Sequence, residues 1–209
     1  VQMEELAAAG RIQRPSDGAP ARRIAFVQCA GSRAGPEKMA GGVAYCSKTC
    51  CSITAKQVDR VLATDPMAET TVVYYRDMRT YERALEALYQ RLRIMGVEFV
   101  NGEVDGIASN GNGDLEVTVA PIVPEDAEEE TEPVGLGADL VVLAAAQRPS
   151  SGSAQLFEKF GVRVDRHGFP VESQPRLYRP TESLVDRVYV VGASSGPKVV
   201  QQSSEQASA

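Results

Sequence analysis

Three of the chain's four cysteines lie within residues 45–51, in the sequence YCSKTCC. The fourth, Cys29, precedes them in the segment FVQCAGSR, so the full pattern is C-x16-C-x3-C-C. Thiolates are soft ligands that suit zinc and iron–sulfur clusters, and four of them complete the ligand set of a structural zinc or a 4Fe–4S cluster. We therefore expect Cys29, Cys46, Cys50 and Cys51 to bind a metal centre.

The same four cysteines allow other interpretations. A buried thiol often serves only as a small apolar side chain. Two disulfides are also possible, although Cys50 and Cys51 are adjacent and the start VQMEELAAAG shows no export signal. Zinc sites usually show two separated C-x2–4-C pairs, a pattern missing here, so the spacing modestly favours an iron–sulfur cluster. The spacing of Cys46 and Cys50 predicts that both share a helical face, and a helix N-terminus beside Cys51 favours a negative cluster.

The composition is that of an ordinary globular chain. Of its 209 residues 43% are hydrophobic and 24% are charged, and the formal net charge of −6 argues against nucleic-acid binding. No apolar run approaches the roughly 20 residues of a membrane-spanning helix. We expect no nucleic-acid partner, no membrane insertion and a cytoplasmic location. The start without Met and the helix-like end VVQQSSEQASA indicate a piece of a longer polypeptide.

Hydrophobic patterns predict strands alternating with helices. Apolar, β-branched runs predict strands at 22–29, 70–77, 97–102, 138–146 and 187–193. Apolar residues at helical spacing predict helices at 51–65 and 79–96. Residues 103–110 and 114–122 predict a hairpin around an Asn-Gly-Asn-Gly turn, and the acidic run 125–132 predicts a solvated loop. The expected fold class is α/β and Rossmann-like, with a parallel sheet plus an antiparallel hairpin.

The loop after the first strand departs from a dinucleotide-binding site. In such a site the strand opens into G-x-G-x-x-G, and the pyrophosphate rests on the next helix N-terminus. Here the strand opens into Gln28-Cys29-Ala30-Gly31, with one glycine in place of three. We interpret this as a nicotinamide-type site given over to a metal centre. The alternative is an α/β domain that never bound a nucleotide, and both interpretations predict no NAD here.

Two segments near the C-terminus indicate a connection with FAD. VVLAAAQRPS (141–150) resembles the return from the nicotinamide domain to the FAD domain of two-domain flavoprotein reductases, with Ala146 in place of Gly. VYVVGASSGPK (188–198) resembles the second FAD motif, with Ala193 in place of the Asp that holds the ribityl chain. Flavin contacts would then shift to backbone N–H groups at a turn and a helix N-terminus. The candidate FAD-binding residues are Arg148, Pro149, Gly192, Ala193, Gly196, Pro197, Lys198 and Gln201.

The chain resembles the A-type flavoprotein of heterodisulfide reductase, and the related flavoprotein subunits of quinone-interacting membrane-bound oxidoreductases. Six segments carry the resemblance, in this order: RPSDG (14–18), IAFVQCAGSR (24–33), YCSKTCC (45–51), YYRDMRTY (74–81), ADLVVLAAA (138–146) and VVGASSGPK (190–198). The similarity covers nearly the whole chain. The stretch AGPEKMAGGVA (34–44) departs from the family's usual sequence, and no C-x2-C-x2-C-x3-C ferredoxin run is present.

The resemblance implies a thioredoxin-reductase-like flavoprotein with two dinucleotide-binding domains. In this family FAD exchanges electrons with iron–sulfur clusters inside a larger cytoplasmic complex, and in some members the flavin bifurcates electron pairs. The four cysteines match the cluster ligands, and Gly192–Gln201 match FAD contacts, with the first FAD motif expected before Val1. The FAD site of this segment is therefore expected to be incomplete. The implied partners are other redox subunits, which are heterodisulfide reductase-like, ferredoxin-like or quinone-linked.

The resulting expectation is an oxidoreductase subunit that relays electrons between FAD and one 4Fe–4S cluster, with no catalytic side chain assigned. The expected domains are a connector (1–22), a cluster-binding domain (23–144) and part of the FAD domain (145–209). The alternative is a non-catalytic docking scaffold stabilised by zinc or a cluster. His167 is expected to be a solvated turn residue, Asp77 to be structural and Tyr74–Arg76 to pack in the core.

Overall fold

The computed structural model describes residues 2–33, 41–122, 132–174 and 179–208. Contacts divide the chain into two units. Unit 1 comprises residues 1–30 and 50–145, and unit 2 comprises residues 31–49 and 146–209. The units are not continuous in sequence, because the segment 31–49 groups with the C-terminal residues rather than with the strand and helix that flank it.

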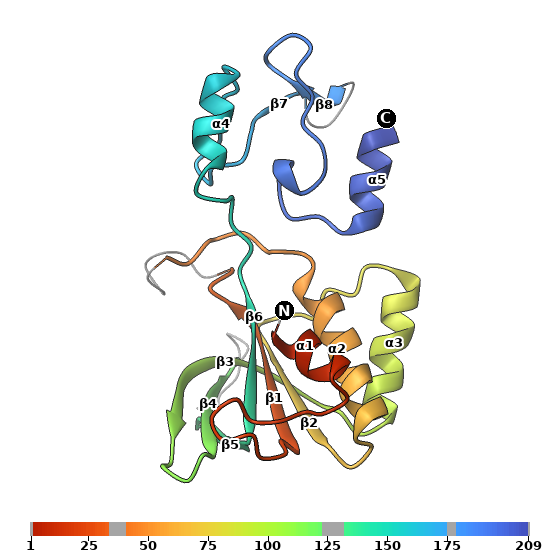
Figure 1. Cartoon of the computed structure of the whole chain (residues 1–209), viewed down its shortest axis with the longest axis vertical. Coiled ribbons are helices and arrows are strands. Elements are labelled where there is room, and N and C mark those ends of the chain that lie inside the picture. Colours follow the sequence, from red (N-terminus) through yellow and green to blue (C-terminus); the bar gives the residue numbers. More distant parts are fainter. Residues whose placement is uncertain (1, 34–40, 123–131, 175–178, 209) are drawn as a thin grey trace. The chain divides into compact units, whose positions relative to one another are not determined.

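The described part of unit 1 is built on a six-stranded sheet with the order β5-β4-β3-β2-β1-β6 (Figure 1). The strands are β1 (Arg23–Ala30), β2 (Glu69–Tyr74), β3 (Glu98–Ser109), β4 (Leu115–Pro121), β5 (Val134–Ala138) and β6 (Leu140–Ala145). Strand β1 pairs in parallel with β2 and β6, and β2 pairs in parallel with β3. The pairs β3–β4 and β4–β5 are antiparallel. This confirms the predicted α/β class with a parallel sheet and an antiparallel hairpin.

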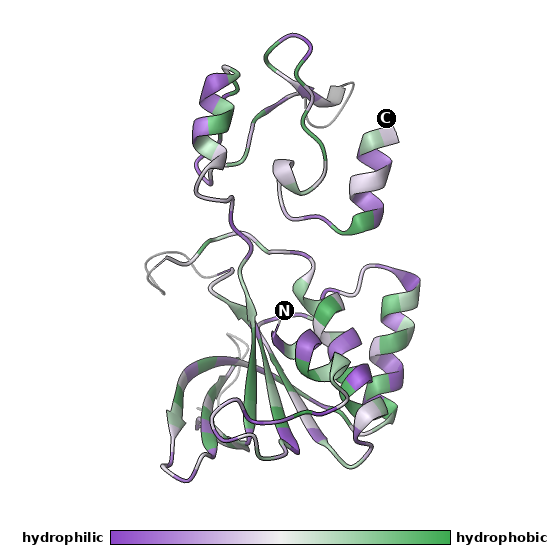
Figure 2. Ribbon diagram, viewed as in Figure 1, coloured by the Kyte–Doolittle hydropathy of each residue, from purple (hydrophilic) through white to green (hydrophobic). Residues whose placement is uncertain are grey.

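Helices α1 (Gln2–Ala8), α2 (Cys50–Thr64) and α3 (Arg83–Ile94) accompany this sheet. Helix α2 buries Val58 and Val61 completely, and they share one core cluster with Phe26 of β1 and Leu92 of α3. Each such burial contributes about 1.5–3 kcal/mol of hydrophobic free energy. Figure 2 shows apolar residues along the central strands and on the helices that pack with them. Both α2 and α3 lie close to their predicted ranges because their apolar residues recur at helical spacing.

Strand β3 changes its partner along its length. Residues Glu98–Asn101 pair in parallel with β2, and Gly102–Ser109 pair antiparallel with β4. A Cβ atom at Gly102 would lie 2.8 Å from the carbonyl oxygen of Ala120, so the close approach at this transition requires glycine. The two strands predicted at 97–102 and 103–110 are therefore one strand, and the predicted hairpin that follows is confirmed.

Strands β4 and β5 complete a second core with the parallel strands. Val117 and Val119 of β4 are fully buried together with Ala25, Val27 and neighbouring residues. Strand β1 belongs to both core clusters, which explains its nearly continuous apolar sequence. Strand β5 was not predicted, because its sequence VGLGA is rich in glycine. The acidic run 125–132 lies, except for Glu132, outside the described residues.

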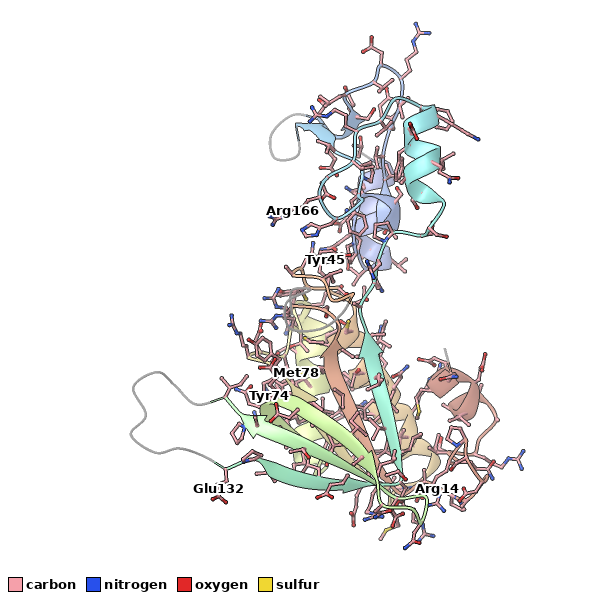
Figure 3. All side chains as sticks on the ribbon, turned by 90° about the vertical axis from the view of Figure 1, so that its left-hand side faces the viewer. Arg14, Tyr45, Tyr74, Met78, Glu132 and Arg166 are labelled. Carbon is pink, nitrogen blue, oxygen red and sulfur yellow. The ribbon has the colours of Figure 1, made fainter. Side chains whose placement is uncertain are left out.

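The RPSDG segment is a structural turn at one end of the sheet. Arg14 Nη2 lies 2.7 Å from Asp17 Oδ2, and Arg14 Nη1 lies 3.3 Å from Asp114 Oδ1 beside the β3–β4 turn. Figure 3 shows Arg14 at the end of the sheet opposite Tyr74. RPSDG therefore joins the N-terminal segment to the hairpin, at the end of the sheet far from Cys29.

Asp139 forms a second anchor at this end of the sheet. Its Oδ2 accepts hydrogen bonds from the backbone N–H groups of Arg22 and Arg23 at 3.0 Å, and its Oδ1 accepts one from Arg23 Nη2 at 2.6 Å. Burial would raise the pKa of Asp139, but these hydrogen bonds and the Arg23 charge outweigh it and lower the pKa. The carboxylate thus stabilises the entry of β1 into the sheet.

Unit 2 contains α4 (Ser153–Lys159), the strand pair β7 (Glu172–Gln174) and β8 (Arg179–Ser183), the 3-10 turn η1 (Gly192–Ser195) and α5 (Val200–Ser208). The predicted strand at 187–193 is wrong. There Tyr189 makes only an isolated bridge to Glu182, and the Val190 N–H donates to the Thr181 carbonyl oxygen at 2.7 Å. A buried parallel strand needs neighbours on both sides, and the described part of unit 2 gives this segment only the β8 edge. Within the described ranges, no helix has the length and apolar character to cross a membrane.

Candidate functional site

Cys29 lies in a β-bulge near the carboxyl end of β1. The register of β1 against β6 shifts between Val27, opposite Leu143, and Ala30, opposite Ala145, so β1 has one extra residue here. Cys29 itself has φ of 59°, in the left-handed region that residues other than glycine seldom adopt. Because a bulge redirects side chains out of the strand's alternation, this backbone sets the direction of the Cys29 thiol.

Cys50 and Cys51 are the first two residues of α2. Cys51 is buried, with 6% of its surface exposed, and Cys50 is half-buried. The first-turn N–H groups of a helix lack intrahelical acceptors and carry partial positive charge. Thiolates at these two positions, and a negatively charged cluster bound to them, would therefore be stabilised by the helix.

A buried hydrogen bond joins the end of β1 to the first turns of α2. Gln28 Nε2 donates to Thr54 Oγ1 at 2.6 Å, and both side chains are at most 5% exposed. Gln28 precedes Cys29, and Thr54 lies one turn after Cys50, so the bond holds the segments of three cysteines at one end of unit 1.

The Gln28 side chain also has unused hydrogen-bonding capacity. Its Oε1 is buried and has no hydrogen-bond partner among the described atoms. Buried polar atoms are nearly always hydrogen-bonded. In the opposite amide orientation, the Thr54 hydroxyl would donate to Oε1 and the Gln28 NH2 group would be left to donate to a sulfur atom. This side chain therefore fits beside a sulfur-rich centre.

Cys46 belongs to unit 2, in the segment Tyr45–Thr49, which we call the Cys46 loop. The prediction that Cys46 and Cys50 share a helical face is wrong, because α2 begins at Cys50 and Lys48 has φ of 58°. The Lys48 N–H instead donates to Cys46 Sγ at 3.3 Å, a bond that ionisation of the sulfur would strengthen. Four residues span at most about 14 Å when extended, so the chain itself keeps Cys46 within reach of Cys50.

The cysteines fit a metal centre in chemical type and number. The structure joins none of the four in a disulfide. In the ranges that the structure describes, no three Cys, His, Asp or Glu side chains are already gathered as metal ligands. A metal site rarely exists preformed in the unfolded chain, so metal binding contributes free energy to folding. The type and number of these thiols suit a zinc ion or a 4Fe–4S cluster.

Unit 2 contains a cavity of about 650 Å³ between the two segments predicted to bind FAD. Its lining residues are Ala146, Gln147, Arg148, Pro149, Ser150, Ser153, Phe169, Ala193, Ser194 and Pro197. Arg148, Pro149, Ala193 and Pro197 were all predicted as FAD-binding residues. The volume lies within the range of roughly 300–1,000 Å³ that is usual for small-molecule sites.

The other predicted FAD-binding residues lie outside this lining. The Gly192 N–H donates to Gln206 Oε1 of α5 at 2.9 Å, so it already has an acceptor. Gln201 is exposed and donates to Glu205 Oε1 at 3.1 Å. Gly196, with φ of 134°, separates η1 from the segment that leads into α5. The structure therefore brings together half of the predicted set and leaves the rest along η1 and α5.

Lys198 gives this region a positively charged, half-buried side chain. Its Nζ donates to Ser195 Oγ at 2.6 Å. Burial lowers the pKa of Lys198, Glu172 opposes this shift, and the charge of Lys48 adds to it. Lys48 belongs to the Cys46 loop, so the loop and the segment before α5 lie within electrostatic reach of each other. An anion between the two lysines would relieve their repulsion.

Three residues of this region were not predicted from the sequence: Tyr45, Gln147 and Phe169. The Tyr45 hydroxyl donates to the Gln147 carbonyl oxygen at 2.8 Å, and its ring meets Phe169 edge-on at 5.6 Å between centroids. Burial raises the pKa of Tyr45. His167, expected to be solvated, packs edge-on against Tyr45 at 4.9 Å. Tyr45 and Arg166, next to His167, lie in one region of Figure 3. The only sequence signal was the position of Tyr45 beside Cys46.

The residues after β2 have structural contacts. Asp77 accepts a hydrogen bond from Arg79 Nε at 2.9 Å, which agrees with the structural role expected for it. The Arg76 guanidinium lies 5.0 Å from the centre of the Tyr75 ring. Tyr74 and Tyr75 are half-buried and Arg76 is exposed, so the predicted core packing of this segment is wrong. Strand β2 ends at Tyr74, and solvent reaches the residues that follow it.

No protein-family model matches the chain. Among solved structures, it aligns with the atypical thioredoxin reductase TRi of Desulfovibrio vulgaris Hildenborough at 12% identity and a TM-score of 0.35, covering 98% of this chain and 52% of that one. It also aligns with FAD-bound DfoA, a cadaverine monooxygenase of Erwinia amylovora, at 10% identity and a TM-score of 0.40, covering 84% and 46%. Scores of this size carry no inference about function.

Curated relatives match at much higher identity. The A-type component of the H(2):CoB-CoM heterodisulfide,ferredoxin reductase of Methanothermobacter thermautotrophicus is 34% identical over 207 residues, which are 95% of this chain and 28% of that protein. The A-type component of the ferredoxin/F(420)H(2)-dependent CoB-CoM heterodisulfide reductase of Methanosarcina acetivorans is 32% identical, over 96% and 24%. An A-type iron-sulfur component of the CoB–CoM heterodisulfide reductase of Methanopyrus kandleri is 32% identical, over 96% and 29%. Over nearly its whole length the chain is therefore a homologue of the A-type component of heterodisulfide reductase, and it spans about 28% of that protein's length.

Proposed function

We propose that this chain is the cluster-bearing segment of an electron-transfer subunit of the heterodisulfide reductase A type. Cys29, Cys46, Cys50 and Cys51 are its proposed ligands for one 4Fe–4S cluster. The observation that carries the proposal is the placement of three cysteines, with Cys29 in a bulge and Cys50 and Cys51 at a helix N-terminus joined to it by the Gln28–Thr54 bond. One relative is named as an iron-sulfur protein, which supports this assignment.

The chain's residues would hold and tune the cluster. When bound, a 4Fe–4S cluster would supply one-electron chemistry and a flavin would supply one- or two-electron chemistry. The Lys48 N–H donates to Cys46 Sγ, and hydrogen bonds to ligand sulfur raise a cluster's reduction potential. The N-terminus of α2 also favours added negative charge on the reduced cluster.

The cavity of unit 2 is the proposed part of an FAD site. Pro149, Ala193 and Pro197 contribute apolar wall, and Arg148 and Lys198 contribute positive charge for a pyrophosphate. Because the relatives are much longer than this chain, the remaining FAD contacts are proposed to come from sequence equivalent to the rest of those proteins.

The proposed partners are redox subunits of heterodisulfide reductase-like, ferredoxin-like or quinone-linked type. Two relatives carry ferredoxin in their names, which supports a one-electron partner of this kind. The proposed location is the cytoplasm, where thiols stay reduced and available to bind metal.

The deciding experiment is iron and acid-labile sulfide analysis of the chain prepared without oxygen, with EPR spectra after reduction by dithionite. About four iron and four sulfide per chain are expected, as for any complete 4Fe–4S cluster. Cys50→Ser is expected to lose iron or change the EPR signal. Ser52→Ala, in the same helical turn but without a ligand atom, is the matched control and should leave both unchanged.

A docking scaffold is the second candidate. It is favoured by Ala193 in place of the usual flavin Asp, and by the Gly192 N–H that Gln206 already occupies. In this case the oxygen-free protein would contain zinc, or no metal, and would show no EPR signal after reduction. That result would overturn the electron-transfer proposal and leave the scaffold.

A further inference from the structure

Gln147 is hydrogen-bonded to three residues of the Cys46 loop. Its carbonyl oxygen accepts from the Tyr45 hydroxyl at 2.8 Å, its N–H donates to Ser47 Oγ at 2.9 Å, and its Nε2 donates to Thr49 Oγ1 at 2.8 Å. About a hundred residues separate the two partners in sequence, yet the bonds reach every second residue of the loop. Cys46 lies between the first two attachment points.

Gln147 is exposed, and its bond from Tyr45 is exposed too, but its bonds to Ser47 and Thr49 are partly buried because these two loop residues are buried. Ser47 is completely buried and Thr49 is 8% exposed. A buried hydrogen bond is costly to remove, because the group left behind loses its partner without regaining water. The loop has little helical or strand structure of its own, since Lys48 has φ of 58° and α2 begins only at Cys50. Its conformation therefore depends on Gln147.

The same residue forms part of the cavity wall. Gln147 and Phe169 both line the cavity, and the Phe169 ring meets the ring of Tyr45, the residue before Cys46. A ligand that fills the cavity would contact the wall on which the Cys46 loop is held. If that ligand restricted Gln147 or Phe169, it would also restrict the neighbours of Cys46. Gln147 is hydrogen-bonded to Tyr45 and Ser47, and Phe169 contacts the Tyr45 ring.

We propose that Gln147 is a positioning residue that fixes Cys46 against the cavity wall, so that a flavin in the cavity restricts the Cys46 thiol. This inference rests on the proposed function, because it takes the cavity as the flavin site. It goes further because the position of the Cys46 thiol, a proposed metal ligand, would depend on whether a flavin occupies the cavity.

The first test measures alkylation of Cys46 by iodoacetamide, in the chain with the other three cysteines replaced by serine. Rates are compared on the high-pH plateau, where the thiol is fully ionised and the rate reports access. Gln147→Ala is expected to raise the rate about three- to tenfold, the effect of one lost hydrogen bond. Ser47→Ala and Tyr45→Phe each remove one acceptor or donor with little change in volume, and are expected to act in the same direction.

Two further variants separate positioning from general destabilisation. Gln147→Glu should restore most of the slow rate, because the Thr49 hydroxyl can donate to a carboxylate. Gln90→Ala, which removes a 2.7 Å bond to Glu86 on an exposed face of α3, is the matched control and should leave the rate unchanged. Equal rates in Gln147→Ala, Ser47→Ala and the control would overturn the positioning role.

The second test adds FAD and follows both flavin fluorescence and the alkylation rate. FAD is expected to slow alkylation of Cys46, and to slow it less in Gln147→Ala. Binding without any slowing would contradict the coupling while leaving the flavin site standing. Absence of binding would contradict the flavin part of the proposed function and its coupling to Cys46, and the first test would still decide whether Gln147 positions the loop.

Discussion

Unit 1 buries apolar side chains in two core clusters that share its parallel strands, whereas unit 2 buries few of them. In the described part of unit 2, the buried aliphatic side chains are Val43, Val162 and Val190. Neither α4 nor α5 has a buried residue, and Leu156, Phe160 and Val200 are exposed. Hydrogen bonds between segments, such as the partly buried ones from Gln147 to Ser47 and Thr49, take a larger share of the contacts there. Unit 1 therefore draws more of its stability from apolar burial than unit 2 does.

The same substitution made once in each unit would test this contrast most strongly. Phe26→Ala removes a fully buried ring from unit 1 and should cost about 3–5 kcal/mol of unfolding free energy. Phe160→Ala removes a ring that is 57% exposed in unit 2 and should change that free energy by less than about 1 kcal/mol. Urea unfolding followed by far-UV circular dichroism measures both. Equal losses would contradict this difference in core packing between the two units.

Asp139→Asn tests the polar anchor of unit 1 and should cost about 1–2 kcal/mol near neutral pH, because hydrogen bonds to a charged acceptor are lost. The lowered pKa of Asp139 fixes the pH dependence. The carboxylate's contribution is complete above its unfolded pKa, near 4, and disappears as pH falls through the lower folded pKa. The difference between wild type and variant should therefore shrink in acid.

Asp59→Asn is the control for Asp139. Its ion pair with Arg91 has side chains that are 40% and 57% exposed, so the variant should cost at most about 1 kcal/mol. A larger cost than that of Asp139→Asn would contradict the view that backbone donors, rather than ion pairing alone, give Asp139 its effect. Urea titrations near pH 7 and near pH 3 measure both variants.

Lys198→Met in unit 2 should have the smallest effect on stability, below about 0.5 kcal/mol at neutral pH, where most surface changes lie. Because the folded pKa is lowered, the folded state binds fewer protons than the unfolded state between the two pKa values. Wild-type stability should thus rise with pH in that alkaline window, and the variant should lose this slope.

The loss of Lys198 should weaken FAD binding strongly, although it changes stability little. Affinity for FAD is expected to fall about tenfold, as for one lost charge-assisted hydrogen bond. Fluorescence titration of FAD measures this, and Lys56→Met, at an exposed position on α2, is the control. Unchanged affinity for FAD would remove Lys198 from the proposed site.

Local sequence was sufficient to predict an element whose residues alone show a helical period or a turn motif. Val58 and Val61 in α2, and the Asn110–Gly113 turn between β3 and β4, were predictable because period and turn chemistry act over a few residues. The strand expected at 187–193 failed because strand formation depends on partners that sequence pattern does not show. β5 was missed because pairing with β4 overrides its glycine-rich composition.

The candidate site also has features that local sequence predicts and features that it does not. Four thiols in one region of the sequence led to the prediction of a metal centre, which stays a prediction. The bulge at Cys29, the positive φ of Lys48 and the bonds to Gln147 were not predictable, because each depends on contacts between distant segments. Gln147 lies in the VVLAAAQRPS motif, but that motif gave it no role, and only its contacts with the Cys46 loop identify one.

The left-handed backbone at Cys29 has an evolutionary consequence. Glycine adopts such a φ without strain, whereas cysteine there costs of order 1 kcal/mol or more. Codons for cysteine and glycine differ by a single nucleotide, and glycine at position 29 would also restore G-x-G at residues 29–31. A lineage that did not need the proposed metal centre would therefore gain stability through one common mutation. Retention of cysteine at this position is a sensitive indicator that selection still acts on the thiol.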